Sequence, residues 1–125
     1  MNLNQVTIPV LNVEKSILFY QKLGLKLIVK SLPHYARFEC INGQATFSIR
    51  RVDTVNNNCG TWIYFEVENL DEIVNNLIDL GLQFEEFPND KPWLWRESRL
   101  KDPDGNQIII YFAGDNRLNP PWKIQ

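Results

Sequence analysis

Residues 10–14 read Val-Leu-Asn-Val-Glu and open a segment that closes with Leu-Gly-Leu at residues 23–25. Residues 67–71 read Val-Glu-Asn-Leu-Asp and open a second segment that closes with Leu-Gly-Leu at residues 80–82. The offset is the same at both ends, because 67 − 10 and 80 − 23 are both 57. Internal similarity at a fixed offset indicates a repeated structural unit. Two copies predict a pseudo-symmetric pair of modules rather than a solenoid.

The similarity continues after these segments. Residues 36–43, Ala-Arg-Phe-Glu-Cys-Ile-Asn-Gly, align with residues 98–105, Ser-Arg-Leu-Lys-Asp-Pro-Asp-Gly, at an offset of 62. A module of about 55 to 60 residues lies near the lower limit for an independent core. We therefore expect the 125 residues to form a single domain. It would comprise module 1 (about 3–51), a linker, module 2 (about 60–112) and an extended C-terminal arm (113–125).

Hydrophobic periodicity assigns the same order of elements to each module, namely a strand, a helix and three strands. In module 1, alternation predicts a first strand over residues 5–10, and helical spacing predicts a helix over 13–23 with Asn12 as its N-cap and Gly24 after its end. The fold class is therefore α+β, with two tandem βαβββ modules. The remaining predicted strands are 25–29, 35–41, 44–50, 61–67, 82–87, 93–101 and 107–112; the second helix is 70–80, between Asn69 and Gly81, and Asn42-Gly43 forms a two-residue hairpin turn.

Side chains alternate along a strand, so each predicted sheet has two different faces. One face is apolar, and we expect the two helices to cover it; it collects Val6, Ile8, Val10, Ala45, Phe47, Ile49, Ile63, Phe65, Val67, Ile108, Ile110 and Phe112. The other, which we call the mixed face, combines aromatic with polar residues: Gln5, Thr7, Thr46, Ser48, Arg50, Trp62, Tyr64, Glu66, Trp95, Glu97, Arg99, Gln107, Ile109 and Tyr111. Such a mixture is typical of a ligand cavity. A solvated or dimer-facing sheet surface remains the alternative.

The composition of the chain excludes some classes of binding partner. The net charge is −2 and the 13 Lys and Arg residues are scattered, so nucleic acid and anionic membranes are not expected partners. No apolar stretch reaches the roughly 18 residues of a membrane-spanning helix, and no signal peptide precedes the first strand, so we expect a cytoplasmic location. Cys40, in a predicted strand, and Cys59, in a loop, are expected to be free thiols.

A duplicated βαβββ module with Leu-Gly-Leu after its first helix and Asp-Pro-Asp-Gly-Asn at residues 102–106 resembles the vicinal oxygen chelate superfamily. This superfamily includes glyoxalase I, extradiol dioxygenases, fosfomycin-resistance transferases and bleomycin-resistance proteins. The resemblance covers about residues 3–112. It implies eight strands in two curved mixed sheets around a shared cleft, helices on the convex face, and a homodimer.

The resemblance also locates the positions that carry metal ligands in the metal-dependent branches. Here these positions hold Gln5, Ser48, Trp62 and Ile109. Gln5 offers only a neutral carbonyl, Ser48 a weak hydroxyl, Trp62 a donor and Ile109 no polar group. We therefore expect neither a metal nor another cofactor. The single histidine, His34, is predicted to lie in a surface loop.

The leading hypothesis is a metal-free protein that binds a small aromatic or amphipathic molecule in its cleft, with a resistance or sequestration role like that of the bleomycin-resistance branch. The predicted ligand-binding residues are Gln5, Thr7, Ser48, Arg50, Trp62, Tyr64, Trp95, Glu97, Arg99, Ile109 and Tyr111. Aromatic side chains would stack on the ligand, and an arginine would bind an acidic group. An internal ion pair between Glu97 and an arginine stays equally open.

Two enzymatic alternatives remain, so the sequence does not decide whether the protein is an enzyme. One is a metal-independent, lyase- or isomerase-like enzyme in which Glu97 is the general base and Arg50 or Arg99 stabilises negative charge. The other is a glyoxalase- or dioxygenase-like metalloenzyme with atypical ligands such as Glu39, Glu66 and His34. Other candidates have simpler interpretations: Trp93 packs at a strand entrance, Trp122 packs on the body or on a partner subunit, and Asp102 and Asp104 belong to a turn.

Overall fold

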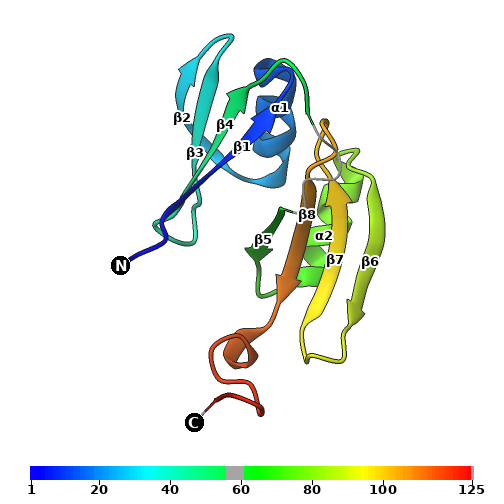
Figure 1. Cartoon of the computed structure of the whole chain (residues 1–125). Helices are drawn as coiled ribbons and strands as arrows, with labels where there is room; N and C mark the ends of the chain where they lie inside the picture. The colour runs from blue at the N-terminus through cyan, green and yellow to red at the C-terminus, as the bar shows by residue number, and fades with distance from the viewer. Residues whose placement is uncertain (56–60, 125) are drawn as a thin grey trace. The chain divides into compact units, whose positions relative to one another are not determined.

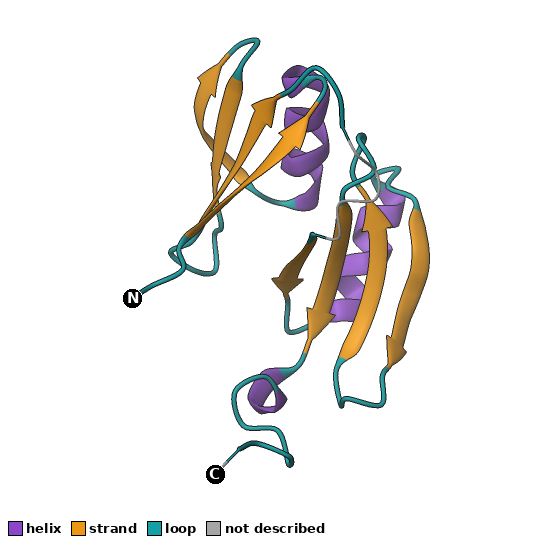
Figure 2. Cartoon of the chain, in the orientation of Figure 1, coloured by secondary structure: helices purple, strands orange, loops and turns teal. Residues whose placement is uncertain are grey.

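The computed structural model describes residues 1–55 and 61–124 and divides them into two compact units (Figure 1). The first unit comprises residues up to 55 together with the turn 102–105, and the second comprises residues 61–101 and 106–124. In each unit one helix covers one face of a four-stranded mixed sheet (Figure 2). This confirms the α+β class and the two βαβββ modules. No helix in the described ranges is both long and apolar enough to span a membrane.

The first unit contains β1 (Gln5–Val10), α1 (Val13–Leu23), β2 (Lys26–Ser31), β3 (Tyr35–Glu39) and β4 (Thr46–Arg51). The strand order is β1-β4-β3-β2. Strand β1 pairs with β4 in parallel, because helix α1 returns the chain to the same end of the sheet, and the other pairs are antiparallel.

The second unit repeats this topology with β5 (Trp62–Glu66), α2 (Leu70–Asp79), β6 (Phe84–Asp90), β7 (Arg96–Lys101) and β8 (Gln107–Phe112). The strand order is β5-β8-β7-β6, again with one parallel pair, β5 with β8. A short 3-10 helix, η1 (Gly114–Asn116), follows β8.

The two helices end alike but begin differently. Gly24 and Gly81 follow α1 and α2 with φ angles of 109° and 93°, a left-handed conformation that glycine adopts without strain. At the start of α1, the side chain of Asn12 accepts a hydrogen bond from the Lys15 N–H at 3.0 Å. Asn69 makes no such cap, since its amide donates to Glu72 Oε2 at 3.1 Å. The predicted N-cap Asn12 is therefore confirmed, whereas Asn69, predicted to precede the second helix, occupies the N-cap position of α2 without a side-chain cap.

Several predicted strand ends are also wrong, and β6 spans Phe84–Asp90 rather than 82–87. Strand β3 ends at Glu39 and β4 begins at Thr46, so Asn42-Gly43 is part of a wider loop closed by a hydrogen bond from Cys40 N to Ala45 O. Strand β7 begins at Arg96 rather than at residue 93, because residues 91–95 form a turn in which Leu94 has a φ of 68°. At the β3–β4 loop and before β7, the alternation of apolar and polar residues continues in the sequence beyond the residues that pair in the sheet. The predicted linker comprises residues 51–60, of which the structure describes only 51–55. Its first residue, Arg51, is the last residue of β4.

The predicted apolar face forms the core of each unit. In the first unit, Tyr20 of α1 packs on Phe38 and Phe47 of the sheet, with ring centroids 5.9 and 4.7 Å apart. In the second unit, α2 buries Leu70, Val74 and Leu77, and the sheet buries Leu100, Ile108 and Ile110. Phe112, predicted for the same face, is largely exposed at the end of β8.

The turn 102–105 belongs to the first unit and lies against α1. Tyr20 Oη donates to Asp102 Oδ2 at 2.6 Å, and Asp104 Oδ1 accepts from the Leu11 N–H at 3.1 Å. Asp104 N–H in turn donates to Asp102 Oδ1 at 2.9 Å. These bonds show that Asp102 and Asp104 are turn residues, as predicted, and that they also hold the start of α1.

The C-terminal arm is not extended where it begins. Glu66 Oε2 accepts hydrogen bonds from the Ala113 and Gly114 N–H groups at 2.8 and 3.0 Å, and η1 follows immediately. Trp95 Nε1 donates to the carbonyl of Asn116 at 3.4 Å. Trp122, by contrast, is 58% exposed within this chain, so its predicted packing on the body is not present.

Candidate functional site

The predicted site residues are divided between the two units. Gln5, Thr7, Ser48 and Arg50 lie in the first unit, and the other seven lie in the second. That all of them converge on a single pocket stays a prediction. Within each unit, strand register does place the predicted residues that lie in strands on one sheet face, the one opposite the helix. Trp95 precedes β7 and reaches this face by packing against Ile109 and Tyr111.

In the first unit the register aligns Gln5 with Thr46 and Thr7 with Ser48 across β1 and β4. Gln5 and Thr7 are exposed, and Gln5 Oε1 accepts a hydrogen bond from Thr46 Oγ1 at 2.8 Å. Ser48 is fully buried. This half of the mixed face is thus polar, with one buried hydroxyl near its centre.

Ser48 has two neighbours that the sequence analysis did not single out, Tyr35 and Arg37 of β3. Tyr35 Oη lies 2.6 Å from Ser48 Oγ, and Arg37 Nε donates to Tyr35 Oη at 2.9 Å. Burial raises the pKa of Tyr35, but the hydrogen bonds to Ser48 and Arg37 and the Arg37 charge lower it by more, so its pKa lies below the ordinary tyrosine value. Alternation along β3 is the signal that would have placed both residues beside Ser48.

In the second unit Glu97 is the most unusual side chain of the mixed face. It is only 1% exposed, and its Oε2 accepts a hydrogen bond from Trp93 Nε1 at 2.6 Å. Its Oε1 lies 3.8 Å from Arg99 Nη2 and has no hydrogen-bond partner among the described residues. The internal ion pair that the sequence left open is therefore present. A buried carboxylate with an unfilled acceptor is costly unless a ligand or a water supplies a donor.

Arg99 connects this carboxylate to the surface. Its Nε lies 3.4 Å from Glu86 Oε2, and Lys91 pairs with the other oxygen of Glu86. On its other side the guanidinium lies 4.7 Å from the centroid of Trp62. Trp93, predicted to pack at a strand entrance, lies in the turn that precedes β7, and its indole N–H also orients the Glu97 carboxylate.

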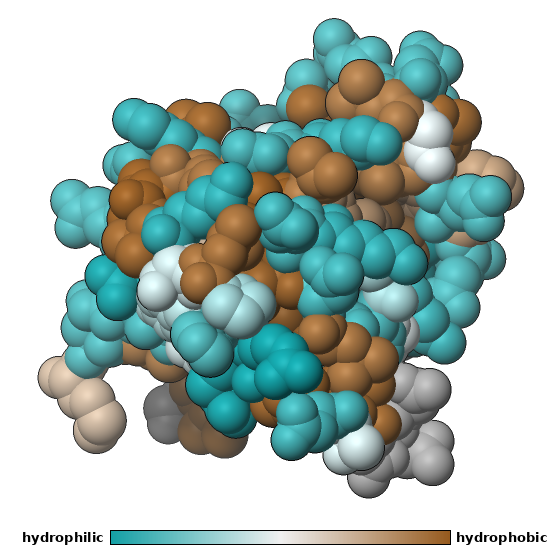
Figure 3. All heavy atoms as spheres, turned by 90° about the horizontal axis from the view of Figure 1, so that it is seen from above, coloured by the Kyte–Doolittle hydropathy of each residue, from teal (hydrophilic) through white to brown (hydrophobic). Residues whose placement is uncertain are grey.

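An aromatic cluster occupies the rest of this face. Trp95 stacks on Tyr111 with centroids 4.8 Å apart, and the Tyr64 ring meets both edge-on at 6.0 and 5.4 Å. Trp95 packs with Ile109, Tyr111 and Ala113, which explains why Ile109 and Tyr111 are buried although they lie on the mixed face. Trp62 and Tyr64 remain 49% and 41% exposed. Both rings are therefore accessible within this cluster. Figure 3 shows one face of the molecule, on which hydrophobic residues are interspersed with hydrophilic ones.

Burial raises the pKa of both Tyr64 and Tyr111 above the ordinary value. The Glu97 carboxylate adds to the shift of Tyr64, and Glu66 adds to that of Tyr111. These phenols are consequently neutral near pH 7 and serve as rings and hydrogen-bonding groups rather than as bases.

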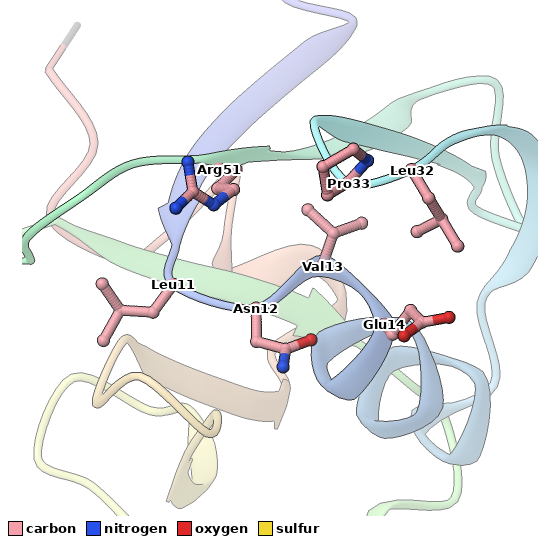
Figure 4. Close-up of a pocket in the computed structure, with 7 residues that line it drawn as sticks. All are labelled: Leu11, Asn12, Val13, Glu14, Leu32, Pro33 and Arg51. Carbon is pink, nitrogen blue, oxygen red and sulfur yellow. The ribbon is translucent and has the colours of Figure 1, made fainter.

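Two hollows lie away from the mixed face. One, of about 340 Å³, is in the first unit between the start of α1 and the β2–β3 loop, and its lining residues are Leu11, Asn12, Val13, Glu14, Leu32, Pro33 and Arg51 (Figure 4). The other, of about 270 Å³, is at the start of α2 and is lined by residues 68–72, Arg96 and Phe112. Neither hollow includes a predicted ligand-binding residue.

The residues at the family's metal-ligand positions do not fit a divalent cation. Ser48 Oγ is engaged with Tyr35, Ile109 is buried and apolar, and Trp62 lies over the positive charge of Arg99. A divalent ion needs oxygen, nitrogen or sulfur donors, mostly anionic or imidazole. Over the described residues, no group of three or more His, Cys, Asp or Glu side chains is arranged to hold a metal. The alternative set is divided between the two units, with Glu39 and His34 in the first and Glu66 in the second, so it stays a prediction.

Comparisons with known proteins agree with this fold. The family model of the Glyoxalase/Bleomycin resistance protein/Dioxygenase superfamily matches residues 2–110. A trivalent organoarsenical cleaving enzyme of Bacillus sp. (strain MD1) is 31% identical over 97% of this chain and 81% of its own length. A bleomycin resistance determinant encoded on transposon Tn5 is 14% identical, with a TM-score of 0.76 over 90% of this chain and 98% of that chain. A bleomycin-binding protein solved with bleomycin is also 14% identical, with a TM-score of 0.72 over the same shares.

Proposed function

Because the chain belongs to the glyoxalase/bleomycin resistance protein/dioxygenase superfamily, we propose that it binds a small aromatic or amphipathic molecule on the mixed face of its second unit, without a metal. The observation that carries this proposal is the pair of exposed rings, Trp62 and Tyr64, above a charged and buried layer. Exposed aromatic side chains side by side on an open sheet face are typical of a binding surface.

The arrangement favours a flat ligand. Stacking of one aromatic ring on another contributes about 0.5 to 1.5 kcal/mol beyond the burial of apolar area. The cation of Arg99 already polarises Trp62 from one side, which leaves the other side of the indole for a ligand. Arg99 is engaged by Glu86 and Glu97, so binding of a ligand carboxylate by Arg99, which the sequence suggested, loses support.

The biological role that follows is sequestration or resistance, carried out in the cytoplasm by a homodimer. The support is the shared fold with a bleomycin-binding protein, a relationship at 14% identity that concerns the fold alone. The exposed indole of Trp122 on the C-terminal arm adds a surface that a partner subunit would cover.

Calorimetric titration with aromatic antibiotics, bleomycin and an aromatic trivalent organoarsenical tests the binding proposal. Trp62→Ala should weaken binding of the best ligand by about 0.5 to 1.5 kcal/mol, roughly two- to tenfold, because one stacking surface is lost. Phe112→Ala is the matched control, since it removes an exposed aromatic ring from the opposite face of the same sheet. A panel without any binder, or equal losses in the two variants, would reject the site.

A metal-independent enzyme is the second candidate, with Glu97 as general base. It is favoured by the buried Glu97 Oε1, which has no hydrogen-bond partner among the described residues, and by the 31% identical relative, which is a cleaving enzyme. Glu97→Gln should abolish turnover of a cleaved panel molecule while binding is retained. Glu85→Gln, which changes an exposed carboxylate of β6, should leave turnover intact. Turnover that survives in Glu97→Gln would show that the assigned role is wrong.

Elemental analysis of the purified protein addresses the metalloenzyme alternative. The donor set described above leads us to expect substoichiometric divalent metal after exhaustive dialysis. A stoichiometric ion that resists dialysis would overturn the metal-free proposal and would direct attention to ligands outside the four family positions.

A further inference from the structure

The group formed by Tyr35, Ser48 and Arg37 lies outside the binding surface proposed above and has no part in it. All three side chains belong to adjacent strands of the first unit, where the register pairs Arg37 with Ser48. The Tyr35 oxygen is within hydrogen-bond distance of both neighbours, at 2.6 Å from Ser48 Oγ and 2.9 Å from Arg37 Nε. A phenol held by a hydroxyl and a guanidinium is an arrangement suited to proton transfer.

Counting hydrogens shows which way the bonds run. The three bonding atoms, Arg37 Nε, Tyr35 Oη and Ser48 Oγ, carry one donor hydrogen each, but they form only two hydrogen bonds with one another. If Tyr35 donated to Ser48, the unused hydrogen would lie on a serine with no exposed surface. If Ser48 donates, the unused hydrogen lies on Tyr35, which is half-buried. The second arrangement costs less, because an unsatisfied donor is penalised most where it is buried.

The charges around Tyr35 favour its ionised form. Arg37 lies over the ring, with its guanidinium carbon 5.5 Å from the centroid, and Arg50 is the register partner of Tyr35 on β4. The carboxylate on this part of the face, Glu39, is at the far end of β3 and pairs with Lys26 of β2 at 3.9 Å. From β1 the face receives Gln5 and Thr7, which carry no charge. A phenolate here would accept two hydrogen bonds and face two cations.

We propose that Tyr35, Ser48 and Arg37 form an acid–base site in which the Tyr35 hydroxyl exchanges a proton with a carbonyl or hydroxyl oxygen of a small molecule bound on the mixed face of the first unit. In the forward step the Tyr35 O–H bond breaks and an O–H bond forms on the small molecule. The electron pair stays on Tyr35 Oη, where the Ser48 hydroxyl and the Arg37 N–H stabilise it. In the reverse step the phenolate removes a proton from a ligand hydroxyl, and nothing is oxidised or reduced.

Spectrophotometric titration tests this site, because phenolate absorbs in the ultraviolet where phenol does not. The chain has four tyrosines, and the pKa values of Tyr20, Tyr64 and Tyr111 are raised, whereas that of Tyr35 is lowered. One tyrosine should therefore ionise before the other three. Tyr35→Phe should remove this first step, and Ser48→Ala and Arg37→Gln should each move it to higher pH. Tyr64→Phe, the matched control, should remove only a late step.

Acetylation tests whether the oxygen is available to a carbonyl compound. N-acetylimidazole transfers its acetyl group to a phenolate: the acyl C–N bond breaks, the C–O bond to tyrosine forms, and imidazole leaves with a proton. At mildly alkaline pH, peptide mapping should show Tyr35 modified several-fold faster than Tyr64, and Arg37→Gln should abolish the difference. A first ionisation that persists in Tyr35→Phe, or equal acetylation of Tyr35 and Tyr64 in the wild type, would overturn the proposal.

Discussion

Tyr20 and Asp102 are 82 positions apart in the sequence, and the 2.6 Å hydrogen bond between them is buried in the first unit. Tyr20→Phe deletes only the donor, which leaves Asp102 Oδ2 without this bond. We expect the free energy of unfolding to fall by about 1 to 3 kcal/mol, the cost of an unsatisfied buried group. Urea denaturation measures this loss. Tyr64→Phe removes a hydroxyl from an exposed ring and should change stability by no more than about 0.5 kcal/mol.

Asp104 contributes to the free energy of unfolding in a pH-dependent way. The sign is opposite to that of a typical carboxylate, whose pKa is lowered by folding. Burial, together with the nearby Asp102 charge, raises its pKa above the ordinary aspartate value despite the hydrogen bond from Leu11. The folded state therefore holds the Asp104 proton more tightly than the unfolded state does. The resulting stabilisation is complete below the unfolded pKa, about 3.9, and is lost as pH rises through the raised folded value.

Asp104→Asn tests this assignment, because asparagine keeps an acceptor for Leu11 but cannot ionise. The stability of the variant relative to wild type should increase from acid to neutral pH, as measured by urea denaturation across that range. Asp53→Asn, at a carboxylate with 90% side-chain exposure, should show little of this trend. A difference that stays constant with pH would mean that Asp104 is not the group responsible.

At the scale of elements, helices α1 and α2 have the same sequence pattern but different N-termini. Asn12 caps α1 through its side chain, whereas the Asn69 side chain is engaged with Glu72. Asn12→Ala should therefore destabilise the protein by about 1 kcal/mol, within the usual range of about 0.5 to 2 kcal/mol for a lost cap. Asn69→Ala is the natural comparison and should cost clearly less in the same chemical denaturation experiment. Equal costs would contradict the capping geometry.

Element boundaries show where sequence patterns fail. Helix α1 and strand β8 have the predicted limits. The apolar periodicity of α1 ends at its capping residues, and that of β8 covers the residues that pair in the sheet. The sequence predicts a two-residue turn at Asn42-Gly43, but such turns need positive φ at the first central residue and, in type I′, at both. Neither Asn42 nor Gly43 is among the described residues with positive φ. Alternation of side chains also predicted that the seventh strand begins at residue 93, whereas β7 begins at Arg96 and a turn precedes it.

At the scale of the whole molecule, the two units allow a direct test of the single-domain prediction. The four tryptophans, Trp62, Trp93, Trp95 and Trp122, all belong to the second unit, so fluorescence reports on that unit, whereas circular dichroism reports on both. If the chain is one cooperative domain, the two signals should give coincident urea transitions. Tyr20→Phe, which acts in the first unit, should then lower the fluorescence midpoint as well. Separate transitions would show that the modules unfold independently.

The sequence by itself determined the duplicated module, the apolar face under each helix and the residues of the mixed face, because these depend on backbone periodicity that repeats locally. Only the tertiary structure decided which mixed-face residues are accessible. Glu97 is paired with Arg99 and bonded to Trp93, and Tyr111 is buried under Trp95. The contacts that decide this come from the turn 91–95, where alternation wrongly predicted a strand from residue 93, and from the segment 113–116, which was predicted to be extended. Burial and pairing of a side chain depend on such non-local neighbours, and a repeating pattern does not encode them.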